Sequence, residues 1–593
     1  MKYVWLFFVA VLFRFLYLGV IPVSLAHDET DNVIQAHSVI QTGRDIVGTW
    51  SPLDFLPNSG VMAELGPVIN APALAILPNN LFAARFTTAL LSSIFPLLVL
   101  YWLTLVGVGS SVATVTAWLL VISPWHILFS RTVLEQPTSL FFYLLSWIFL
   151  SRLVLSYKYK QSNFVNFINL LFFTLTYGIG FYTYHGYKFS LPILTSILLF
   201  WHFWINSKKK IRILLIIPAL FVVGLVLRTA LNSTHYASRG GELLFGHTAQ
   251  YNKSINDDRR QSLAPEILKR TYSNKPLKLI QSVRDKYVGA LNPDLLFLHG
   301  ESNGVFSTWQ TGYLYLITLP FLLLGIGYLL LTHKREQILI LCLLVVSPIA
   351  SIIHVNNTVA FRSGIYFVFL NIVTAYGLIQ ATKLMKPLSQ YLQYVVYVIF
   401  ATILISSLSY FYYIYFYVFP VTNAGAYFYN DRVVANYVRL TPSNKTLLIV
   451  NQPRYLYSAI TLTSNNITKE DIDSFNHRYS PSDLDEYHRG NLTVVKNCKG
   501  IKDADYETVI ISKNILGDQN DCEPLIKLKQ KVPGVSSSSL VSPLDSGEEY
   551  RIVGDKLCEN NELSSYVHPT TLTDFRLEQM KQSDFCVKWV VRQ

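Results

Sequence analysis

Apolar runs long enough to cross a lipid bilayer alternate with short polar segments through the first 420 residues of the chain. About 20 mainly apolar residues span a bilayer as an α-helix. The pattern therefore predicts an all-α polytopic membrane domain over residues 1–420, with about eleven transmembrane helices. The expected spans lie near residues 4–21, 81–105, 111–129, 138–156, 164–181, 189–206, 213–229, 311–331, 338–353, 363–381 and 391–418.

The first apolar run is interpreted as an uncleaved helix rather than a secretory signal. Arg14 interrupts the run, and the small-residue cleavage site at Val23–Ala26 is weak. Many further spans follow it, as expected for the first helix of a polytopic protein.

Lysine and arginine cluster in four short segments between the runs, at 157–160, 207–212, 333–335 and 382–386. Cytoplasmic loops of membrane proteins carry an excess of these residues. With the N-terminus in the cytoplasm, all four segments fall on the cytoplasmic side. This orientation places the loops 22–80 and 230–310 and everything after about residue 418 outside. The expected location is the plasma membrane.

Both long outer loops contain a helical pattern. In the first, Val33 and Val39 belong to an apolar set at helical spacing that Gly43 ends, which predicts a short helix at the interface. In the second, apolar residues from Leu277 to Leu291 alternate with basic residues. A basic amphipathic helix of this kind usually rests on the membrane surface.

The C-terminal region, residues 421–593, has a different character. Short apolar runs at 446–450, 508–512, 550–553 and 586–591 alternate with Asn, Asp, Gly and Ser. These runs predict strands of an extracytoplasmic α/β or α+β domain.

Four of the five cysteines lie in this region, at Cys498, Cys522, Cys558 and Cys586, and their spacings fit no metal motif. In an exported domain they indicate two disulfides with three alternative pairings, and four reduced thiols are the other interpretation.

The distribution of charge and the absence of a glycine-rich motif exclude two kinds of binding partner. The formal net charge is +12, but the basic residues sit in the short loops, so the charge reflects membrane orientation and nucleic acid is excluded as a partner. No glycine-rich phosphate-binding motif follows a strand, so no nucleotide site is expected.

The densest group of ionisable residues follows the first span. His27, Asp28, Glu29 and Asp31 lie within five positions at the edge of the membrane domain. Charge beside lipid indicates a functional site by default. The alternative is that Asp28 or Thr30 caps the following helix, which explains one acid but not the group. We interpret Asp28 as a catalytic carboxylate.

Four further groups fall on the outer face in the predicted topology. The inner loops are almost purely basic, whereas the outer turns mix acids, histidine, aromatic residues and cations, which favours one site on the outer face. The groups are Ser123–Pro137, Tyr182–Lys188, Asn292–Asn303 and His354–Arg362. Within Asn292–Asn303, the residues Asp294, His299 and Glu301 are the weaker candidates.

Such a site suits a phosphate-linked substrate. Arg and Lys neutralise a phosphate, and a carboxylate accepts a proton from an attacking hydroxyl or amine. Glycosyl transfer from a polyprenyl-phosphate sugar needs both, because charge develops on the departing phosphate. His27 would ligate a metal with Asp28 or Glu29, but spacing fixes no third ligand, so the metal and any other cofactor stay unknown.

Two stretches also carry a resemblance to a known family. The Asp28-Glu29 pair, with T-G-R-D-I-V-G downstream, and the stretch Ser123–Pro137 resemble the GT-C superfamily of membrane glycosyltransferases. The likeness covers roughly residues 1–420 and is greatest to protein O-mannosyltransferases and lipid A aminoarabinose transferases. One departure is Gln136, which separates Glu135 from the proline.

The resemblance implies roles for individual residues. Asp28 matches the catalytic acid, Glu29 a neighbour that positions the acceptor, Arg131 a donor-site arginine and Glu135 a second acid of the site. By their place in the topology, Lys188 and Arg362 are expected to contact the donor phosphate. The residues expected to bind substrate are Glu135, Tyr184 and His185.

Each of these residues also has a structural interpretation. Arg131 would be an interfacial arginine whose charge reaches for water, and Glu135 would cap the fourth span. Tyr184 and His185 would pack in the aromatic belt.

The predicted function is an integral membrane glycosyltransferase, a hexosyl- or pentosyltransferase, that moves a sugar from a polyprenyl-phosphate donor to an extracytoplasmic acceptor. Direct displacement with Asp28 as the base would invert the anomeric configuration. The acceptor is a protein, a lipid or a glycan, and membrane lipids are the other partners. The alternatives are a transporter or flippase for a lipid-linked or anionic substrate and a non-catalytic assembly scaffold.

Overall fold

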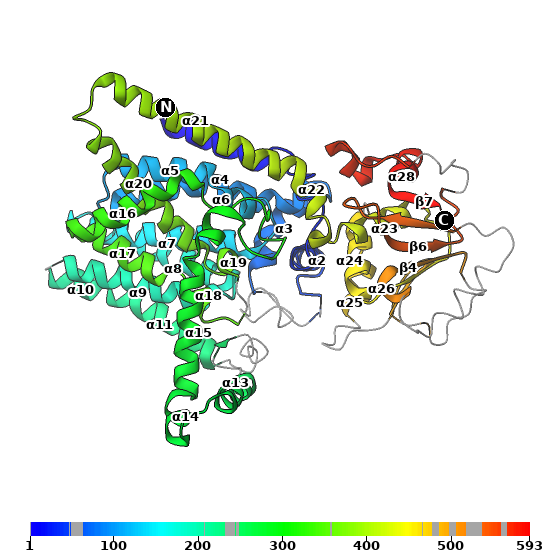
Figure 1. The fold of residues 1–593 in the computed structure, drawn as a ribbon, viewed down its shortest axis with the longest axis horizontal. Helices are drawn as coiled ribbons and strands as arrows, with labels where there is room; N and C mark the ends of the chain where they lie inside the picture. Colours follow the sequence, from blue (N-terminus) through cyan, green and yellow to red (C-terminus); the bar gives the residue numbers. More distant parts are fainter. Residues whose placement is uncertain are drawn as a thin grey trace.

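The structure is a computed structural model, and it describes most of the chain. The described residues are 2–46, 48, 63–206, 208–231, 243–244, 248–355, 358–464, 467–476, 486–496, 498, 506–516, 537–558 and 566–592. A bundle of apolar helices and a smaller part built on a β-sheet lie end to end along the longest axis (Figure 1). We call the end of the bundle next to the sheet the sheet-facing end.

The bundle contains the predicted membrane spans. Eight helices in the described part are long and apolar enough to cross a membrane, and a bent pair brings the number to nine. The long helices are α4 (Leu81–Leu105), α7 (Glu135–Lys158), α8 (Asn163–Thr183), α9 (Tyr187–Ile205), α11 (Ile216–Leu231, preceded by α10, Lys209–Leu214), α17 (Arg335–Val346, followed by α18, Ile349–Ile352), α20 (Gly364–Leu384) and α21 (Gln390–Tyr413). The shorter apolar helices α1 (Lys2–Phe15) and α16 (Leu319–Thr332, after η3, Leu316–Thr318) account for the two remaining expected runs.

One expected span is not a single helix. The run at 111–129 divides into α5 (Ser110–Ile122) and α6 (Pro124–Ser130), which meet at an angle of 56°. Pro124 has no backbone N–H to donate, and the residue before a proline is disfavoured in helical geometry. Ser123 is accordingly extended, with φ −60° and ψ 125°. The expected span at 111–129 is therefore present as a bent pair of helices.

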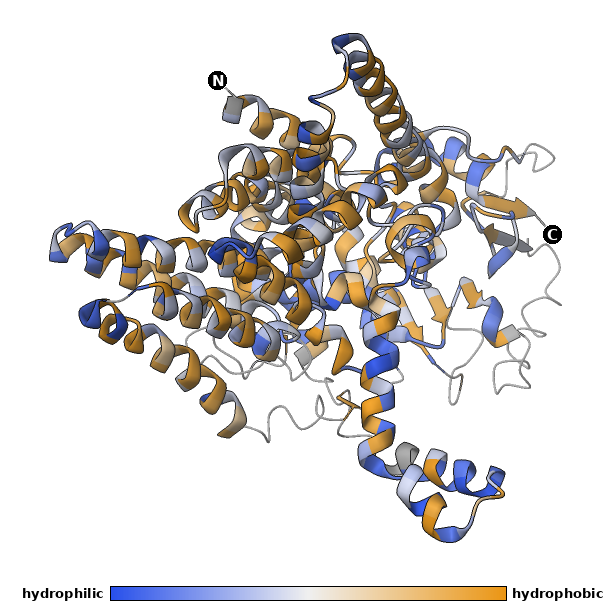
Figure 2. Ribbon diagram, turned by 60° about the vertical axis from the view of Figure 1, so that its left-hand side comes forward, coloured by the Kyte–Doolittle hydropathy of each residue, from blue (hydrophilic) through white to orange (hydrophobic). Residues whose placement is uncertain are grey.

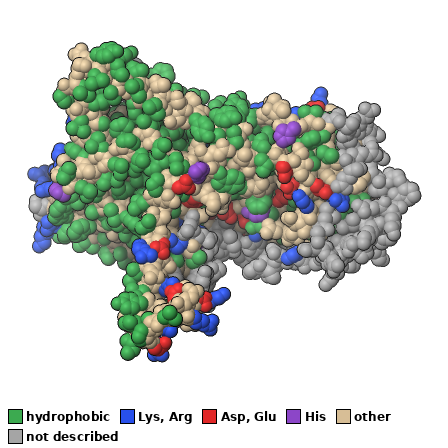
Figure 3. Space-filling model, in the orientation of Figure 1, with side chains coloured by type: hydrophobic (Ala, Val, Ile, Leu, Met, Phe, Trp, Pro, Cys, Tyr) green, Lys and Arg blue, Asp and Glu red, His purple; other side chains and the backbone are tan. Residues whose placement is uncertain are grey.

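Several spans expose their apolar side chains. Only 6% of the most apolar window of the last span and 22% of that of the span ending in α11 are buried. Figure 2 shows apolar residues along the helices of the bundle, and Figure 3 shows them covering its surface. In water such a surface would be unfavourable, whereas lipid chains cover it without cost. The chain is therefore a multi-pass membrane protein.

The basic segments lie at the end of the bundle away from the sheet. Figure 1 places α10 and α17, which begin in two of these segments, at this far end, and Figure 3 shows Lys and Arg side chains along its edge. The segregation of charge agrees with the expected topology. Which face of the membrane each end meets stays a prediction.

The two predicted helices of the outer loops are present. The first is α2 (His27–Thr42), which Gly43 ends with a left-handed φ of 68°, and α3 (Gly66–Ile76) packs against it. The second is α15 (Lys275–Ala290), which follows α13 (Thr248–Gln261) and α14 (Glu266–Tyr272). In Figure 1, α15 runs across the direction of the spans. Its contact with a membrane surface stays a prediction.

Short elements lead from the bundle to the sheet and line the sheet-facing end. They are η2 (Asp294–Leu298), α19 (Val359–Arg362), η4 (Ile414–Val418), α22 (Phe419–Thr422), η5 (Gly425–Tyr427), α23 (Tyr429–Leu440), α24 (Pro453–Thr463) and α25 (Lys469–Asn476). Helix α24 packs on α2, so it joins the C-terminal part to the bundle. The division of the chain into domains at residue 420 stays a prediction.

The described C-terminal part has one mixed sheet, as the α/β or α+β expectation required. Its seven strands lie in the order β2-β3-β1-β4-β6-β5-β7, with β1 parallel to β3 and β4 and the other pairs antiparallel. The strands are β1 (Thr446–Ile449), β2 (Glu486–Arg489), β3 (Leu492–Val495), β4 (Thr508–Ser512), β5 (Ser537–Val541), β6 (Glu548–Val553) and β7 (Val590–Arg592). Short helices α26 (Lys513–Leu516), η8 (Leu572–Phe575), η9 (Leu577–Gln579) and α28 (Gln582–Trp589) complete the described part.

The predicted strand at 586–591 is mostly helical. Residues up to Trp589 belong to α28, and only the last two enter β7. Phe585 and Trp589 stand four residues apart and are fully buried, which is the spacing of one helix face. A disulfide joins Cys558 to Cys586, and Cys498 is also disulfide-bonded. Cys522 lies outside the described residues.

Candidate active site

Buried arginines hold the loop between α1 and α2, residues 16–26. This loop lacks regular hydrogen bonding for much of its length, so its carbonyl oxygens need other partners. Arg85, in the first turns of α4, donates to the carbonyl oxygens of Leu18 at 3.3 Å, Pro22 at 2.7 Å and Ser24 at 2.6 Å. Its side chain is fully buried.

Arg131, at the end of α6, holds the last turn of α1 and Ile21 of the same loop. Its guanidinium donates to the carbonyl oxygens of Phe13 at 3.3 Å, Arg14 at 3.0 Å and Ile21 at 3.1 Å, and to the hydroxyl of Tyr415 at 3.2 Å. These contacts and its complete burial give Arg131 a structural role. Its predicted contact with a donor phosphate stays a prediction that these bonds do not favour.

Glu29 is the residue that caps α2. Its carboxylate accepts one hydrogen bond from the Ala26 N–H at 2.9 Å and another from the Val133 N–H at 2.7 Å. The side chain is fully buried, and burial raises its pKa while the nearby Arg85 opposes the shift. Glu29 therefore ties the start of α2 to the segment after Arg131, which is a positioning role. Its predicted catalytic role stays a prediction.

Asp28 differs from the two other acids of the group. It is exposed in the first turn of α2, where the helix dipole favours a negative charge. Asp31 is buried instead, and it forms an ion pair with Arg454 of α24 at 2.7 Å. Since Glu29 provides the cap, the capping interpretation does not account for Asp28. An exposed carboxylate beside a membrane surface can accept a proton from a bound acceptor.

His27 packs between two aromatic rings of the C-terminal part. The imidazole stacks on Phe428 with ring centroids 3.3 Å apart and on Tyr455 at 3.5 Å. Burial, reinforced by the charge of Arg454, lowers the pKa of His27 to about 3, so the ring is neutral at physiological pH. Among the described residues, no group of three or more His, Cys, Asp or Glu side chains is placed to hold a metal ion.

Lys188, Glu135 and a residue that sequence reasoning missed come together between α7 and α9. The Lys188 ammonium donates to both carboxylate oxygens of Glu64, at 2.7 and 2.8 Å, and both side chains are almost completely buried. Glu135, at the start of α7, accepts a hydrogen bond from the Ala63 N–H at 3.3 Å. Lys188 therefore already has a carboxylate partner. The signal for Glu64 was its position as an isolated acid in the first outer loop.

A second group of charges surrounds α19. Arg362 is half-buried and donates from Nε to the Thr358 hydroxyl at 3.0 Å. Lys286 of α15 donates to the Val355 carbonyl oxygen at 2.8 Å, and burial together with Arg362 lowers the pKa of this lysine. Each positive charge disfavours the other, so an anion bound nearby would stabilise both. Sequence reasoning weighed Arg362 but assigned Lys286 only to an amphipathic pattern.

Glu301 bonds to the backbone of α19, the helix that carries Arg362. One of its carboxylate oxygens accepts the Ala360 N–H at 2.6 Å, so Glu301 positions the turn that carries Arg362. The other oxygen is buried and makes no hydrogen bond to any residue that the structure describes. Burial raises the pKa of Glu301 to about 7, and the Ala360 N–H opposes the shift.

Aromatic rings fill the space beside these two groups. Tyr184 is buried and packs edge-on against Tyr187 at 5.0 Å and Phe361 at 5.2 Å between ring centroids. His185 is half-buried in the turn before α9, where its carbonyl oxygen accepts the Lys188 N–H at 3.1 Å. Packing accounts for the position of Tyr184. The predicted contacts of both residues with substrate stay predictions.

Contacts between distant segments bring the predicted residues to one end of the bundle. Glu29 bonds to Val133, Glu135 bonds to Ala63, and Gln136 bonds to the hydroxyl of Tyr187 at 2.6 Å. The structure thus gathers Asp28, Glu135, Lys188, Tyr184 and Arg362 at the sheet-facing end. Arg131 and Glu29 instead bond to backbone groups and hold the chain in place.

The chain has distant structural relatives, although no protein-family model and no curated protein sequence matches it. It aligns with the oligosaccharyltransferase of Archaeoglobus fulgidus in its apo form, with a TM-score of 0.43 and 13% identity over 78% of this chain and 63% of that one. This chain therefore spans less than two thirds of that protein.

Another structure of the A. fulgidus protein, with an inhibitory peptide and a dolichol-phosphate, gives a TM-score of 0.42 and 12% identity over 90% of this chain and 72% of that one. ArnT from Cupriavidus metallidurans, bound to undecaprenyl phosphate, gives 0.47 and 12% identity over 93% and 97%. Superpositions this distant do not fix a reaction, a substrate or a site residue.

Replacing Arg85 with methionine tests the role of the buried arginines. The Arg85→Met protein leaves the carbonyl oxygens of Leu18, Pro22 and Ser24 buried without a donor, and each such group costs about 1–3 kcal/mol. We expect the free energy of unfolding to fall by about 3 kcal/mol or more, measured as a lower thermal midpoint in detergent. Arg152→Met is the control, because Arg152 is exposed on α7. Equal midpoints for the two variants would contradict this role.

Glu301 predicts a specific pH dependence of stability. Its pKa is about 7 in the folded protein against a usual value of 4.5, so the folded state binds the proton more tightly. The resulting stabilisation is complete below about pH 4.5 and is lost as the pH rises through about 7. Between pH 5 and pH 8, the wild type should lose about 2–3 kcal/mol more than Glu301→Gln. The comparison of thermal midpoints at both pH values measures this difference, and parallel curves would disprove it.

Proposed function

We propose that the chain is an integral membrane glycosyltransferase that moves a sugar from a polyprenyl-phosphate donor to an acceptor outside the cytoplasm. The supporting observation is the division of roles at the start of α2. Glu29 and Asp31 are buried and engaged by backbone N–H groups and by Arg454, whereas Asp28 is exposed in the same turn. Exposure leaves the Asp28 carboxylate within reach of a bound acceptor.

Asp28 acts as the general base in this proposal. The acceptor hydroxyl or amine gives its proton to Asp28 while its oxygen or nitrogen bonds to the anomeric carbon of the sugar. The bond between that carbon and the phosphate oxygen breaks, and the electron pair leaves with the polyprenyl phosphate. A single displacement of this kind inverts the anomeric configuration.

Arg362 and Lys286 are the cations that we assign to the departing phosphate. The charge of Arg362 contributes to the lowered pKa of Lys286, and Glu301 positions the turn that carries Arg362. Charge that develops on the phosphate would be stabilised by these two side chains. Arg131 is engaged by backbone carbonyl oxygens and Lys188 by Glu64, so neither is assigned to the phosphate here.

The transporter alternative is not favoured by the charges inside the spans. Transport pathways place ionisable residues where they face a substrate. The buried arginines near the ends of α1 and α4 instead bond to backbone carbonyl oxygens: Arg14 donates to Ala10, Leu120 and Val121, and Arg85 to the α1–α2 loop. Their role is to hold the backbone.

Asp28→Asn tests the proposal on purified protein in lipid. Radiolabelled polyprenyl-phosphate sugars are supplied with a crude envelope extract, and release of polyprenyl phosphate is measured. The loss of a general base should reduce the rate roughly 10²–10⁴-fold. Asp584→Asn is the matched control, because Asp584 is also exposed in the first turn of a helix, α28, within the C-terminal part. Release by Asp28→Asn at the wild-type rate would reject Asp28 as the base, and no release by the wild type with any sugar would reject the function.

Arg362→Gln and Lys286→Gln test the phosphate contact. A hydrogen bond to a charged group is worth about 1.5–3 kcal/mol, so each substitution should raise the donor concentration at half-maximal rate roughly 10-fold or more. Arg284→Gln is the control on the same helix, since Arg284 is exposed and paired with Asp285. An unchanged KM for the donor in both variants would remove these residues from the phosphate site.

A further inference from the structure

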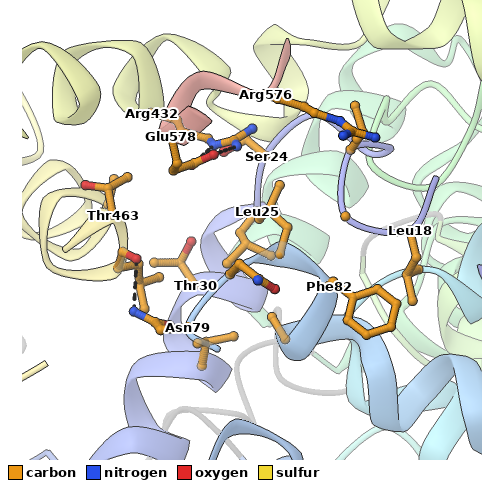
Figure 4. Close-up of a pocket in the computed structure, with 18 of the residues that line it drawn as sticks. Leu18, Ser24, Leu25, Thr30, Asn79, Phe82, Arg432, Thr463, Arg576 and Glu578 are labelled. Atoms are coloured by element: carbon orange, nitrogen blue, oxygen red, sulfur yellow. Dashed lines mark hydrogen bonds and ion pairs between the residues drawn. The ribbon is translucent and has the colours of Figure 1, made fainter. Parts of the chain in front are cut away.

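A cavity of about 570 Å³ lies where the sheet-facing ends of α1 and α4 meet the C-terminal part (Figure 4). Its volume is within the range of roughly 300–1,000 Å³ that is typical of small-molecule sites. The predicted phosphate contacts Arg131, Lys188 and Arg362 are not among its lining residues. It is therefore distinct from the contacts that we assign to the donor phosphate.

One end of the cavity is apolar. It is lined by Phe15 at the end of α1, by Leu18 of the following loop, and by Leu81 and Phe82 at the start of α4. The rings of Phe15 and Phe82 pack with centroids 6.2 Å apart. Since α4 is one of the membrane spans, these side chains lie at the edge of the lipid layer. A hydrocarbon chain can pass from the membrane into this end without leaving apolar surroundings.

The other end is polar but electrically balanced. Arg432 of α23 and Glu578 of η9 form a two-bond ion pair, at 2.8 and 2.5 Å, which Figure 4 shows beside the cavity. Asp431 accepts a hydrogen bond from the Tyr550 hydroxyl at 2.6 Å. Arg576 is exposed, and its side chain extends towards the α1–α2 loop (Figure 4). The two arginines and two carboxylates carry a formal charge of zero together, so this end has no excess of positive charge for a phosphate.

His27 provides an unused hydrogen-bonding group in the lining. Its Nε2 atom is buried and makes no hydrogen bond to any residue in the described part of the chain. The ring is held on both faces by Phe428 and Tyr455, so this nitrogen has a fixed position. A buried polar atom without a partner is costly unless a ligand or water satisfies it. A ligand hydroxyl would satisfy it.

We propose that this cavity binds the acceptor, a membrane amphiphile whose head carries hydroxyl groups and no net charge in the cavity. The apolar end takes the start of its hydrocarbon chain, and His27, Thr463 and the charged pairs bind its hydroxyls. The assignment of the ligand as acceptor rests on the proposed glycosyl transfer. Because His27 adjoins Asp28, a hydroxyl of the bound head lies next to the turn that carries the base.

The proposal also gives the C-terminal part a role. The charged lining residues Asp431, Arg432, Arg576 and Glu578 all belong to the C-terminal part, whereas α1, the loop after it and α4 supply apolar lining residues. The cavity exists only where the two parts of the chain meet. The donor contacts at α19 and α15 lie outside this cavity, so donor and acceptor occupy separate places.

The test uses the full chain in vesicles of phosphatidylcholine and a diacylglycerol glucoside that carries a photoreactive group on its acyl chain. After irradiation, mass spectrometry maps the labelled peptides. We expect the label on peptides that include Phe15–Val33, Pro78–Ala84 or Phe428–Arg432, and excess unlabelled glucoside should displace it. Ala459→Trp, which fills the cavity from α24, should reduce this label at least 10-fold. Ala401→Trp, on the lipid-exposed face of α21, should not change it.

A second variant distinguishes loss of binding from misfolding of the Ala459→Trp protein. His27→Phe keeps a ring between Phe428 and Tyr455 and removes Nε2, so the label should fall about five- to ten-fold with an unchanged thermal midpoint. Label spread evenly over the lipid-exposed helices, in the wild type and in every variant, would overturn the proposal. Displacement by polyprenyl phosphate in place of unlabelled glucoside would also overturn it, since the cavity would then belong to the donor. A parallel sample also contains the radiolabelled polyprenyl-phosphate sugars. Label in the cavity without donor consumption would overturn the proposed function and leave an amphiphile site, whereas donor consumption without label in the cavity would overturn the cavity proposal alone.

Discussion

Arg85 and Arg131 hold the loop between α1 and α2 by its backbone carbonyl oxygens, and the positions of the acids on α2 depend on those bonds. A loop at a membrane edge cannot leave buried carbonyl oxygens without donors, because each one costs about 1–3 kcal/mol. Guanidinium groups suit this task, since each offers five N–H donors in a fixed plane. Glu29 completes the arrangement by capping α2 and bonding to Val133.

This arrangement separates buried residues that hold the backbone from the exposed Asp28. The two arginines and Glu29 are buried and engaged, so they act as positioning residues for the turn that exposes Asp28. Glu64 engages Lys188, and the charge of Arg362 contributes to the lowered pKa of Lys286. The C-terminal part fixes α2 from outside through the ion pair of Asp31 with Arg454. Chemistry at the sheet-facing end therefore depends on both parts of the chain.

The spans and the mixed sheet could be predicted from the sequence because their signals are local. A run of about 20 apolar residues or a short β-branched run needs no distant partner to be recognised. Two exceptions are local as well: Pro124 breaks a span, and the i, i+4 pair of Phe585 and Trp589 makes a helix where alternation suggested a strand. Both signals were present but weaker than the overall apolar pattern.

The roles of site residues could not be read in the same way, because they depend on contacts between distant segments. Glu29 and Asp28 are neighbours, and only the approach of Val133, 104 positions away, separates a cap from an exposed acid. The sequence pattern predicts that Arg131 binds a phosphate. It does not reveal that the carbonyl oxygens of Phe13, Arg14 and Ile21 accept hydrogen bonds from this side chain. The ion pair of Lys188 with Glu64 could not be predicted either, because the two residues are far apart in the sequence.

The most direct measurement is the anomeric configuration of the transferred sugar. The purified protein in lipid receives a polyprenyl-phosphate sugar of defined configuration, and NMR spectroscopy of the product determines the configuration of the new bond. Single displacement with Asp28 as the base predicts the opposite configuration to that of the donor. A product that retains the donor's configuration would contradict this account, because it requires a covalent intermediate or a second displacement.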